Sequence, residues 1–493
     1  MLTAFQTLSN FKPIAYFGQA INYVYNYLMT HKTIRIAGAQ GFYGDSPMAA
    51  LNIVMEKGAD YLMHDALAEL TLSILQKDRQ QDPSLGYARD IELMARTLYP
   101  AAFANGIKIV SNSGGLNPHS AAKKVSEILA KQGIKGIKIA TITGDDLLAK
   151  IPELQQAGLQ LEHLDTGAPL SSSKNPLTHA NVYIGAKSVK EALDKGAQLI
   201  LAGRVADPCL TLGILAHEFG WKIDGDLSQS DLDKLACGIT IGHVIECGGQ
   251  ASGGNSYAEW PMDYPIHNLG YPIAHVQHDG SAIFTKLESQ GGKVSRNTIR
   301  EQLVYEIHDP ANYITPDVTV DLTHVEVKDI APNQVSFKGA KGKPRPEKLK
   351  LAIGQMDGFI SEQFFFFSWP YAYEKCEKFI DAAKNIWASL PLQIERSEFS
   401  IIGINGIHGD ASPAPSKEWL AQANELGVRV TLKHKDERTG KMAMVGITCL
   451  GLNGPPGVNS MPGWGKTGRV KLKLWPTLIP REFVKEEVQL IEV

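Results

Sequence analysis

The sequence lacks the cysteine pattern of a disulfide-stapled or zinc-binding protein. Its 493 residues include only five cysteines, with no CxxC pair: Cys209, Cys237, Cys247, Cys376 and Cys449. An odd number of widely spaced cysteines suggests neither a disulfide framework nor a thiolate zinc cage, and it favours a reducing compartment. We therefore expect a cytoplasmic protein without a bound metal.

The chain also lacks a basic surplus and a membrane-spanning run at its start. Lys and Arg total 49 against 52 Asp and Glu, a formal net charge of -3, so nothing favours binding to a phosphate backbone. Residues 1–32 contain no unbroken apolar span and no small-residue cleavage site. We expect no nucleic-acid partner and no membrane span, and we treat residues 1–32 as an extension with a candidate amphipathic helix at 20–28.

Nucleotide fingerprints are missing as well. The glycine-bearing strings GAQGFYGDS (38–46) and SNSGGLNP (111–118) match neither GxGxxG nor GxxxxGK[ST]. Backbone N–H groups of Gly41, Gly114 and Gly115 could still hold a phosphate or carboxylate, although ordinary turns explain the glycines equally well. No nicotinamide, flavin or nucleotide cofactor is expected.

What the sequence does contain is a repeated alternation of short β-branched runs and helical stretches. Runs at 34–39, 60–65, 107–113, 137–143 and 198–204 each end in a turn and lead into a helical pattern, as at 48–57 and 120–131. Such repeats predict an α/β fold, a Rossmann-like, mostly parallel sheet with helices on both faces, over residues 33–235. Ligands of such sheets bind beyond the carboxyl ends of the strands.

The second half has a different pattern. Residues 236–345 combine a glycine-rich stretch with strand-like runs, which predicts a mixed β region packed on the first. Residues 346–493 read as strands at 348–354 and 359–368, a helix at 372–388, two strands, a helix after Asp436 that three glycines interrupt, and a final strand. This order predicts a ferredoxin-like split βαββαβ unit.

Polar residues gather at the predicted strand ends of residues 33–235. If the strands are neighbours and parallel, these side chains share one edge and can line one cleft. Each alone has a plain explanation, since several are good helix caps and Arg204 and Asp207 can form a simple ion pair. The candidate catalytic acids are Asp65 and Glu69, and the candidate ligand-binding residues, besides the three glycines above, are Asp45, Asn112, Asn117, Asp145, Asp146, Arg204 and Asp207.

The string GHVIECGGQASGG (242–254) concentrates further candidates. His243 and Glu246 are candidate proton-transfer residues, and their spacing of three would also suit two metal ligands, but no third ligand is evident. A buried structural histidine and a small buried Cys247 are the simpler interpretations. Lys286, at the end of a predicted strand, is a candidate for binding an anionic substrate.

A series of strings occurs along the chain from about Ile34 to near Val484: IRIAGAQGFYGDS, DYLMHDALAELTLSIL, DPSLGYARD, GIKIVSNSGGLNP, TGDDL, AGRVADPCLTLG, HEFGW, GHVIECGGQASGG, NLGYPIAHV, EQLVYEIHDPANYITPDV and LNGPPG. Taken together and in this order, they resemble the acyclic terpene utilisation (AtuA) family. The resemblance implies a role in the breakdown of acyclic terpenes or branched acyl-CoA thioesters. It does not supply a reaction or any catalytic residue.

We therefore expect an enzyme of hydratase or lyase type that acts on a branched unsaturated or 3-hydroxy acyl-CoA or a carboxylate, in a possible homo-oligomer. Asp65, Glu69 or His243 would move a proton, Asn112 and the glycine amides would polarise a thioester carbonyl, and Arg204 would hold a carboxylate. One alternative is a non-catalytic binding or assembly subunit of an acyl-CoA carboxylase. Another is a metal-dependent hydrolase that uses His243 and Glu246.

Overall fold

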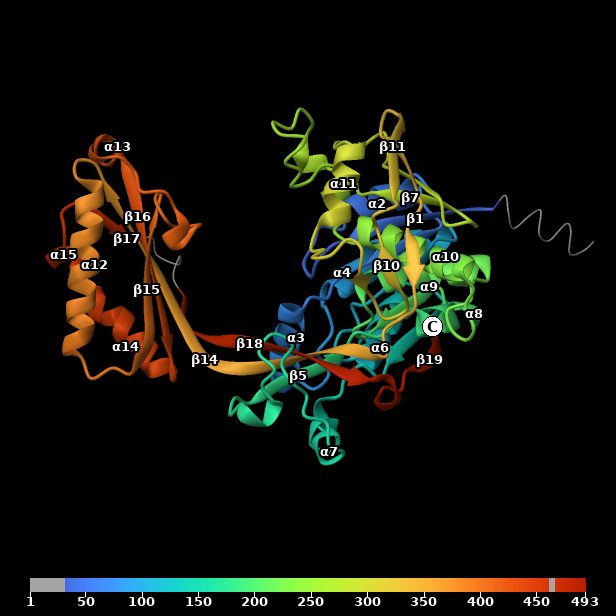
Figure 1. The fold of residues 1–493 in the computed structure, drawn as a ribbon, viewed down its shortest axis with the longest axis horizontal. Helices are drawn as coiled ribbons and strands as arrows, with labels where there is room; N and C mark the ends of the chain where they lie inside the picture. The colour runs from blue at the N-terminus through green and yellow to red at the C-terminus, as the bar shows by residue number, and fades with distance from the viewer. Residues whose placement is uncertain (1–31, 461–465) are drawn as a thin grey trace, which may run out of the picture. The chain divides into compact units, whose positions relative to one another are not determined.

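The computed structural model describes residues 32–460 and 466–493. The predicted amphipathic helix at 20–28, and all of the predicted extension except Lys32, lie outside the described residues. The chain divides into two compact units (Figure 1), which are considered separately. The larger unit contains the residues up to Ser172, His179–Ile353 and Pro476–Val493, and the smaller contains Ser173–Thr178 and Gly354–Trp475. Helices and strands occur in both, so the predicted α/β class is confirmed.

A ten-stranded mixed sheet forms the larger unit, in the order β11-β12-β8-β7-β1-β2-β3-β6-β4-β19. The five strands from β1 to β4 in this order are parallel to one another, and the flanking strands pair antiparallel. The bounds are β1 (Thr33–Gln40), β2 (Tyr61–His64), β3 (Lys108–Ser111), β4 (Lys138–Thr143), β6 (Leu199–Ala202), β7 (Ile273–Gln277), β8 (Ala282–Thr285), β11 (Glu326–Ala331), β12 (Gln334–Lys338) and β19 (Glu487–Glu492).

Helices follow the parallel strands, as the sequence predicts. The predicted helices at 48–57 and 120–131 correspond to α2 and α6. The helices of the larger unit are α2 (Met48–Met55), α3 (Glu69–Gln81), α4 (Asp90–Thr97), α5 (Tyr99–Ala104), α6 (Pro118–Lys131), α7 (Ile151–Gln156), α8 (Lys187–Asp194), α9 (Asp207–Phe219), α10 (Gln229–Ile245) and α11 (Arg296–Val304).

The parallel strands are buried on both faces. Leu199 and Leu201 of β6 belong to a core shared with α2, α4 and α6, whereas Ile200 between them is equally buried but lies outside that core. Successive side chains of a strand point to opposite faces, so both faces of β6 are covered. A strand that is buried on both faces requires apolar side chains in succession, and Leu199–Ala202 is such a run.

The direction of these five strands determines where polar side chains meet. Because β1, β2, β3, β6 and β4 run the same way, their carboxyl ends share one edge of the sheet. The residues just after those ends begin at Gly41, Asp65, Asn112, Gly203 and Gly144. Residues far apart in the sequence are thereby brought side by side.

A three-stranded sheet completes the larger unit. Its order is β13 (Lys341–Lys343), β10 (Thr319–Asp321) and β9 (Tyr313–Ile314), and α10 contacts both β13 and β10. The strand β5 (Leu177–Val182) pairs with β14 (Lys348–Ser368).

The smaller unit carries a sheet in the order β15-β16-β14-β17, with β18 also paired to β14. The two strands predicted at 348–354 and 359–368 are one continuous strand, β14, and the helix predicted after Asp436 is present despite its glycines. Apolar side chains of α12 and α14 pack on the sheet, among them Phe379 and Ala443. The bounds are α12 (Ala372–Ser389), β15 (Ile394–Ile402), α13 (Lys417–Gln422), β16 (Glu425–His434), α14 (Glu437–Ile447), α15 (Leu450–Asn453), β17 (Val458–Ser460) and β18 (Lys466–Pro480).

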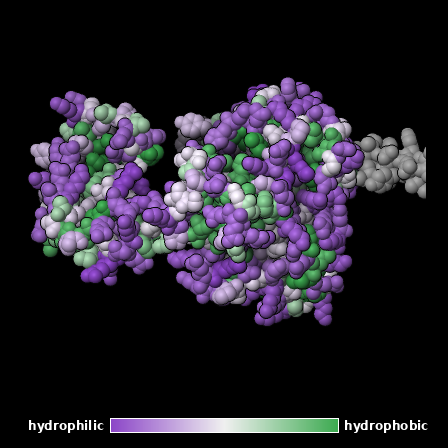
Figure 2. Space-filling view, turned by 60° about the horizontal axis from the view of Figure 1, so that its bottom comes forward, coloured by the Kyte–Doolittle hydropathy of each residue, from purple (hydrophilic) through white to green (hydrophobic). Residues whose placement is uncertain are grey.

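Polar side chains cover most of the drawn face of each unit, with apolar ones showing in smaller patches (Figure 2). Within residues 32–460 and 466–493, none of the helices combines the length and the apolar character that crossing a membrane requires.

Candidate functional site

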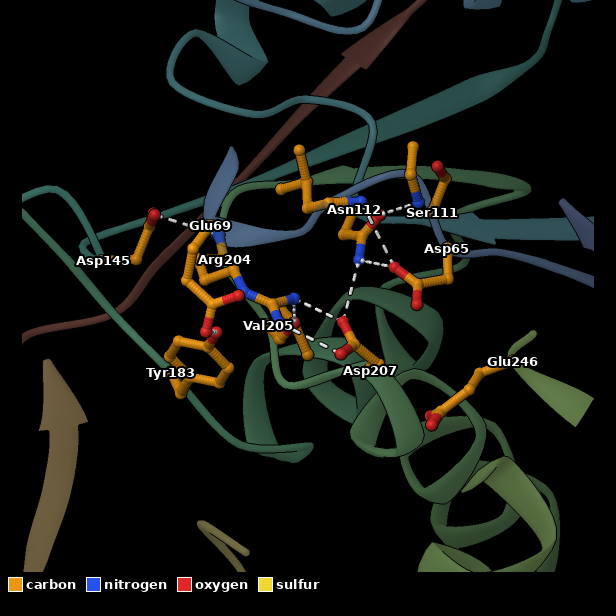
Figure 3. A network of polar contacts seen from close by, with 12 residues as sticks. Asp65, Glu69, Ser111, Asn112, Asp145, Tyr183, Arg204, Val205, Asp207 and Glu246 are labelled. Carbon is orange, nitrogen blue, oxygen red and sulfur yellow. Dashed lines mark hydrogen bonds and ion pairs between the residues drawn. The ribbon is translucent and has the colours of Figure 1, made fainter. Parts of the chain in front are cut away.

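Two side chains at neighbouring strand ends form the centre of a buried polar cluster (Figure 3). Asp65 follows β2 and Asn112 follows β3, and the Asn112 Nδ2 donates to Asp65 Oδ1 over 2.7 Å. The Asn112 Oδ1 accepts the backbone N–H of Ala66, also at 2.7 Å, so the amide cannot rotate without losing a bond. The same Nδ2 lies 3.5 Å from Asp207 Oδ1, which connects Asp65 to the start of α9.

A buried ion pair joins β6 to α9. Arg204 is only 2% exposed, and both terminal nitrogens of its guanidinium donate to the Asp207 carboxylate, Nη2 to Oδ2 over 3.0 Å. Its Nη1 also donates to the Val205 carbonyl at 3.1 Å, and the guanidinium lies 4.1 Å from the centre of the Tyr183 ring. A fork of this kind fixes the carboxylate geometrically as well as electrostatically.

A second cation and a second carboxylate surround the same tyrosine. The Tyr183 hydroxyl donates to Glu69 Oε1, the Lys350 Nζ donates to that oxygen over 3.0 Å, and this ammonium lies 4.4 Å from the ring centre. Burial alone would raise the pKa of Glu69, but the Lys350 charge and the two hydrogen bonds outweigh it and lower the pKa to about 2. Glu69 is thus held as a carboxylate, and it is poorly suited to donate a proton near neutral pH.

The glycine-rich string contributes a third acid. Glu246 follows α10, and its Oε1 lies 2.9 Å from His243 Nδ1. Among the described residues, neither Glu246 Oε2 nor His243 Nε2 has a hydrogen-bond partner, although both atoms are buried. Burial lowers the pKa of His243 to about 4, so the imidazole is neutral at physiological pH.

The electrostatic environment separates the acids of this cluster into two kinds. Burial, and then the charge of Asp207, raises the pKa of Asp65 well above its ordinary value, and the same two causes raise the pKa of Glu246. Asp207 is instead the anionic partner of Arg204. In Figure 3 the Asp207 carboxylate is directed toward the Arg204 guanidinium, and the Asp65 carboxyl group faces Asn112. Two carboxyl groups with raised pKa and a carboxylate held by an arginine therefore occur together, which is the arrangement that acid–base chemistry needs.

An apolar cavity of about 530 Å³ lies beside this cluster. Asp207 and Tyr183 line it together with Pro208, Tyr313 and Lys350, and its other walls are mainly apolar: Ile314, Pro316, Pro346, Leu349 and Leu478. Two of these walls are tied together by Arg481, which donates to the carbonyl of Pro346 over 2.9 Å and to that of Pro316. The size and lining suit a small organic ligand with a few fixed polar groups at one end.

Tyr313 was not among the candidates from the sequence. It lies on the two-residue strand β9, lines the apolar cavity and has its ring centre 5.4 Å from that of His243. Burial raises the pKa of its hydroxyl, and the charges of Glu246, Cys209 and Asp207 add to the shift, so it belongs to the same electrostatic neighbourhood. A strand this short gives no periodic signal, so only the fold reveals it.

Some predicted residues lie at the same sheet edge but serve the backbone. Asp45 Oδ2 accepts the N–H of Gly41 at 2.9 Å, and the Tyr271 hydroxyl donates to the same carboxylate. Asn117 caps α6 by accepting the N–H of Ser120.

Close packing and local hydrogen bonds occupy the remaining predicted residues. A Cβ on Gly114 would lie 2.6 Å from the Ala202 carbonyl oxygen, and the Gly115 N–H donates to the Asn112 carbonyl. The ammonium of Lys286 donates to the carbonyls of Leu287 and Gln290, away from the acids.

The adjacent acids Asp145 and Asp146 have different environments. Asp145 is buried and its Oδ2 accepts the backbone N–H of Arg204 at 2.9 Å and the side-chain amide of Asn181 at 2.7 Å. Asp146 is more exposed and pairs with Arg79. Asp145 therefore supports the Arg204 backbone, whereas Asp146 lies outside the buried cluster.

In the part of the chain that the structure describes, no group of three or more His, Cys, Asp or Glu side chains is arranged to hold a metal ion.

Comparison with known proteins gives one match. A family model described as "Acyclic terpene utilisation family protein AtuA" matches residues 34–490. No curated protein and no solved structure matches the chain.

Proposed function

Because the chain belongs to the acyclic terpene utilisation (AtuA) family, we propose that it is a cytoplasmic enzyme of acyclic terpene or branched acyl-CoA breakdown. The proposed reaction is of the hydratase or lyase type, in which water or a carbon fragment is added to or lost from a branched unsaturated or 3-hydroxy acyl thioester. The proposed site is the cluster of Asp65, Asn112, Arg204, Asp207 and Glu246.

One observation carries this proposal: two buried carboxyl groups with raised pKa stand next to a carboxylate held by a buried arginine. Adding water across a double bond conjugated to a thioester needs one group that takes a proton from water and another that gives a proton to the α-carbon. Asp207 is the proposed acceptor, and Asp65 or Glu246 is the proposed donor. Arg204, whose terminal nitrogens already bond Asp207 and a backbone carbonyl, keeps the acceptor in place.

The apolar cavity supports the substrate class. Its walls from Ile314, Pro316 and Leu478 offer no charge to a hydrocarbon chain, and Asp207 is among its lining residues. An acyl chain in this cavity would present its carbon atoms near the acids and away from bulk water, where proton transfer is most strongly controlled by the protein.

The fold details fit the same proposal. We propose that the parallel part of the larger sheet is Rossmann-like, because strands alternate with helices and the polar residues gather at the carboxyl edge. The smaller unit is proposed to be ferredoxin-like, because the strand–helix–strand–strand–helix–strand order of β14, α12, β15, β16, α14 and β17 folds with β14 and β16 side by side at its centre.

Replacing the two acids whose pKa is raised tests the function. Asp65→Asn and Glu246→Gln keep the shape of the side chain but remove the transferable proton, so each should lower turnover of a branched enoyl-CoA by about 100-fold or more. Hydration is followed by loss of the enoyl-thioester absorbance. The matched control is Asp82→Asn, since Asp82 is exposed and caps a turn at Ser84.

Unfolding curves show whether the variants keep their fold. We expect the two acid variants to unfold at nearly the wild-type denaturant concentration, because an amide keeps the size of the carboxyl group and carries no charge that burial would disfavour. Wild-type turnover in both variants would reject the proposed acid–base role.

A further inference from the structure

The turn after β1 and the glycine-rich turn after α10 form walls of a second cavity, of about 580 Å³. The first turn follows β1 at Gly41, and the second follows α10 from Cys247 onwards. A Cβ on Gly41 would lie only 2.6 Å from the backbone nitrogen of Gly248, so glycine is what allows these turns to touch. The two turns therefore act as packed walls of a cavity, and this gives a specific role to a motif that the proposed acid–base chemistry leaves unexplained.

Side-chain amides are the largest group in the polar lining of this cavity, which we call the carboxamide cavity, beside Ser46, His267, Tyr271 and Tyr305. Four of its lining residues are Gln250, Asn255, Asn268 and Gln290. Among the described residues that line it, there is no Lys, Arg, Asp or Glu. A phosphate or carboxylate would find no permanent cation here, whereas a neutral ligand with amides or hydroxyls would find both donors and acceptors.

Gln290 gives the second, independent sign that a ligand binds. Its side chain is only 5% exposed, and its Oε1 is buried without a hydrogen-bond partner among the described residues. Leaving a buried carbonyl oxygen unpaired is costly, so an acceptor at a cavity wall indicates a donor that arrives from outside the chain.

Three other lining residues are apolar and exposed. Phe42, Met48 and Ile266 line the same cavity and are 62%, 58% and 64% exposed. A ligand that fills the cavity would cover part of these side chains, which stabilises the complex through burial of apolar surface. The ligand is thus neutral, with amide or hydroxyl groups on some of its atoms and hydrocarbon on others.

Each of the two cavities has a link along the chain to the acid cluster. Cys247 lines the carboxamide cavity and is the chain neighbour of Glu246, whereas Asp207 lines the apolar cavity. Asp65 is influenced by the charges of both Asp207 and Glu246. One of the acids therefore lines the apolar cavity, and the chain neighbour of another lines the carboxamide cavity.

We infer that the carboxamide cavity binds the pantetheine arm of a thioester substrate, an inference that rests on the proposed function. The arm is uncharged, carries two amides and a hydroxyl, and has methylene and methyl groups between them, which matches the carboxamides and the apolar walls. With the arm here and the acyl chain in the apolar cavity, the thioester carbon lies at the acid cluster. The phosphates of coenzyme A lie outside the cavity, because its lining offers them no cation.

Calorimetric titration of the full chain with pantetheine, the arm without phosphates or acyl group, tests this inference. Gln250→Leu and Asn268→Leu each remove amide hydrogen bonds at partly or fully exposed positions, and each should weaken pantetheine binding about tenfold. Gln334→Leu is the matched control, since Gln334 is an exposed amide on β12 and does not line the cavity. Its affinity for pantetheine should equal that of the wild type.

The outcomes separate this inference from the proposed function. Asp65→Asn should bind pantetheine as tightly as the wild type while losing turnover. If the wild type does not bind pantetheine, or if all three leucine variants bind it equally, the inference is wrong whatever the acid variants do. If pantetheine binding depends on Gln250 and Asn268 but Asp65→Asn and Glu246→Gln keep full turnover, the arm site stands and the acid–base proposal fails.

Discussion

Two buried polar clusters, one in each unit, differ in how completely their hydrogen bonds are made. In the smaller unit, Ser361 Oγ lies 2.8 Å from His434 Nε2, His434 Nδ1 lies 2.7 Å from the Asp436 carbonyl oxygen, and Ser361 Oγ also accepts the N–H of Gly468 at 3.0 Å. In the larger unit, Glu246 and His243 bond each other but each keeps a buried atom without a partner among the described residues.

The difference helps to tell structural clusters from functional ones. A serine beside a histidine resembles a nucleophile with its base, yet here every polar atom of the pair holds β14, β16 or β18 in place, and Gly440 of α14 packs directly on the histidine. The Asp65–Glu246 cluster has raised carboxyl pKa values and unpaired atoms, which cost stability. Such costs are typical of sites that bind or transform a ligand.

The largest expected effect comes from removing the positive charge of Arg204 from the cluster in the larger unit. Arg204→Met leaves Asp207 partly buried without its partner, and we expect the free energy of unfolding to fall by about 3–5 kcal/mol. Urea unfolding measures this fall in the free energy of unfolding. Arg35→Met is the matched control, because the Arg35–Asp60 pair is about two-fifths exposed on both sides and should lose less than about 1 kcal/mol. Equal losses would show that the buried pair has no special role.

The next effect concerns pH and Asp145. Burial, opposed in part by hydrogen bonds from Arg204 and Asn181, raises its pKa to about 6. The folded state therefore binds this proton more tightly than the unfolded state. Its stabilising contribution is complete below about pH 4 and is lost as the pH rises through about 6, by up to about 3 kcal/mol.

Asp145→Asn removes this titration while its amide oxygen can still accept both hydrogen bonds. Between about pH 4 and pH 6 the wild type should lose stability relative to the variant, and urea unfolding at a series of pH values compares them. Parallel curves would contradict the assigned pKa shift.

The smallest expected effect concerns the Ser361–His434 pair of the smaller unit. Ser361→Ala leaves His434 Nε2 and the Gly468 N–H without partners, which should cost about 2 kcal/mol but leave turnover unchanged. Hydrogen–deuterium exchange of β14 and β16 amides reports this loss locally. Ser389→Ala, at an exposed helix end, should leave the exchange unchanged. A loss of turnover with Ser361→Ala would assign the smaller unit a part in the chemistry.

The sequence predicts the site residues that directly follow parallel strands. Asp65, Asn112 and Arg204 stand immediately or nearly so after β2, β3 and β6, so the strand-end rule brings them together without knowledge of the fold. The same rule selects Asp45 and Asn117, because turns need side chains that bond their own backbone. Local sequence does not separate the two uses.

Residues that reach the cluster from elsewhere are harder to predict. Tyr183 directly follows β5, so the strand-end rule could have selected it from the sequence. Lys350 lies within β14, and its role depends on the pairing of β5 with β14. Glycine has a low helix propensity, yet α14 continues through Gly440. The missing side chain leaves room for His434 against the helix, and this packing outweighs the propensity.

The hydrogen bonds from Arg481 to the carbonyls of Pro316 and Pro346 also bear on the order in which parts of the protein form during synthesis. Pro316 and Pro346 leave the ribosome before Arg481, which connects them through hydrogen bonds. Strand β4 likewise leaves the ribosome before β19, the strand that pairs with it. Until Arg481 and β19 emerge, a nascent chain carries an untied apolar pocket and an open strand edge, which are features that chaperones bind and that promote aggregation. The walls of the apolar cavity are therefore connected only after these segments have emerged and docked.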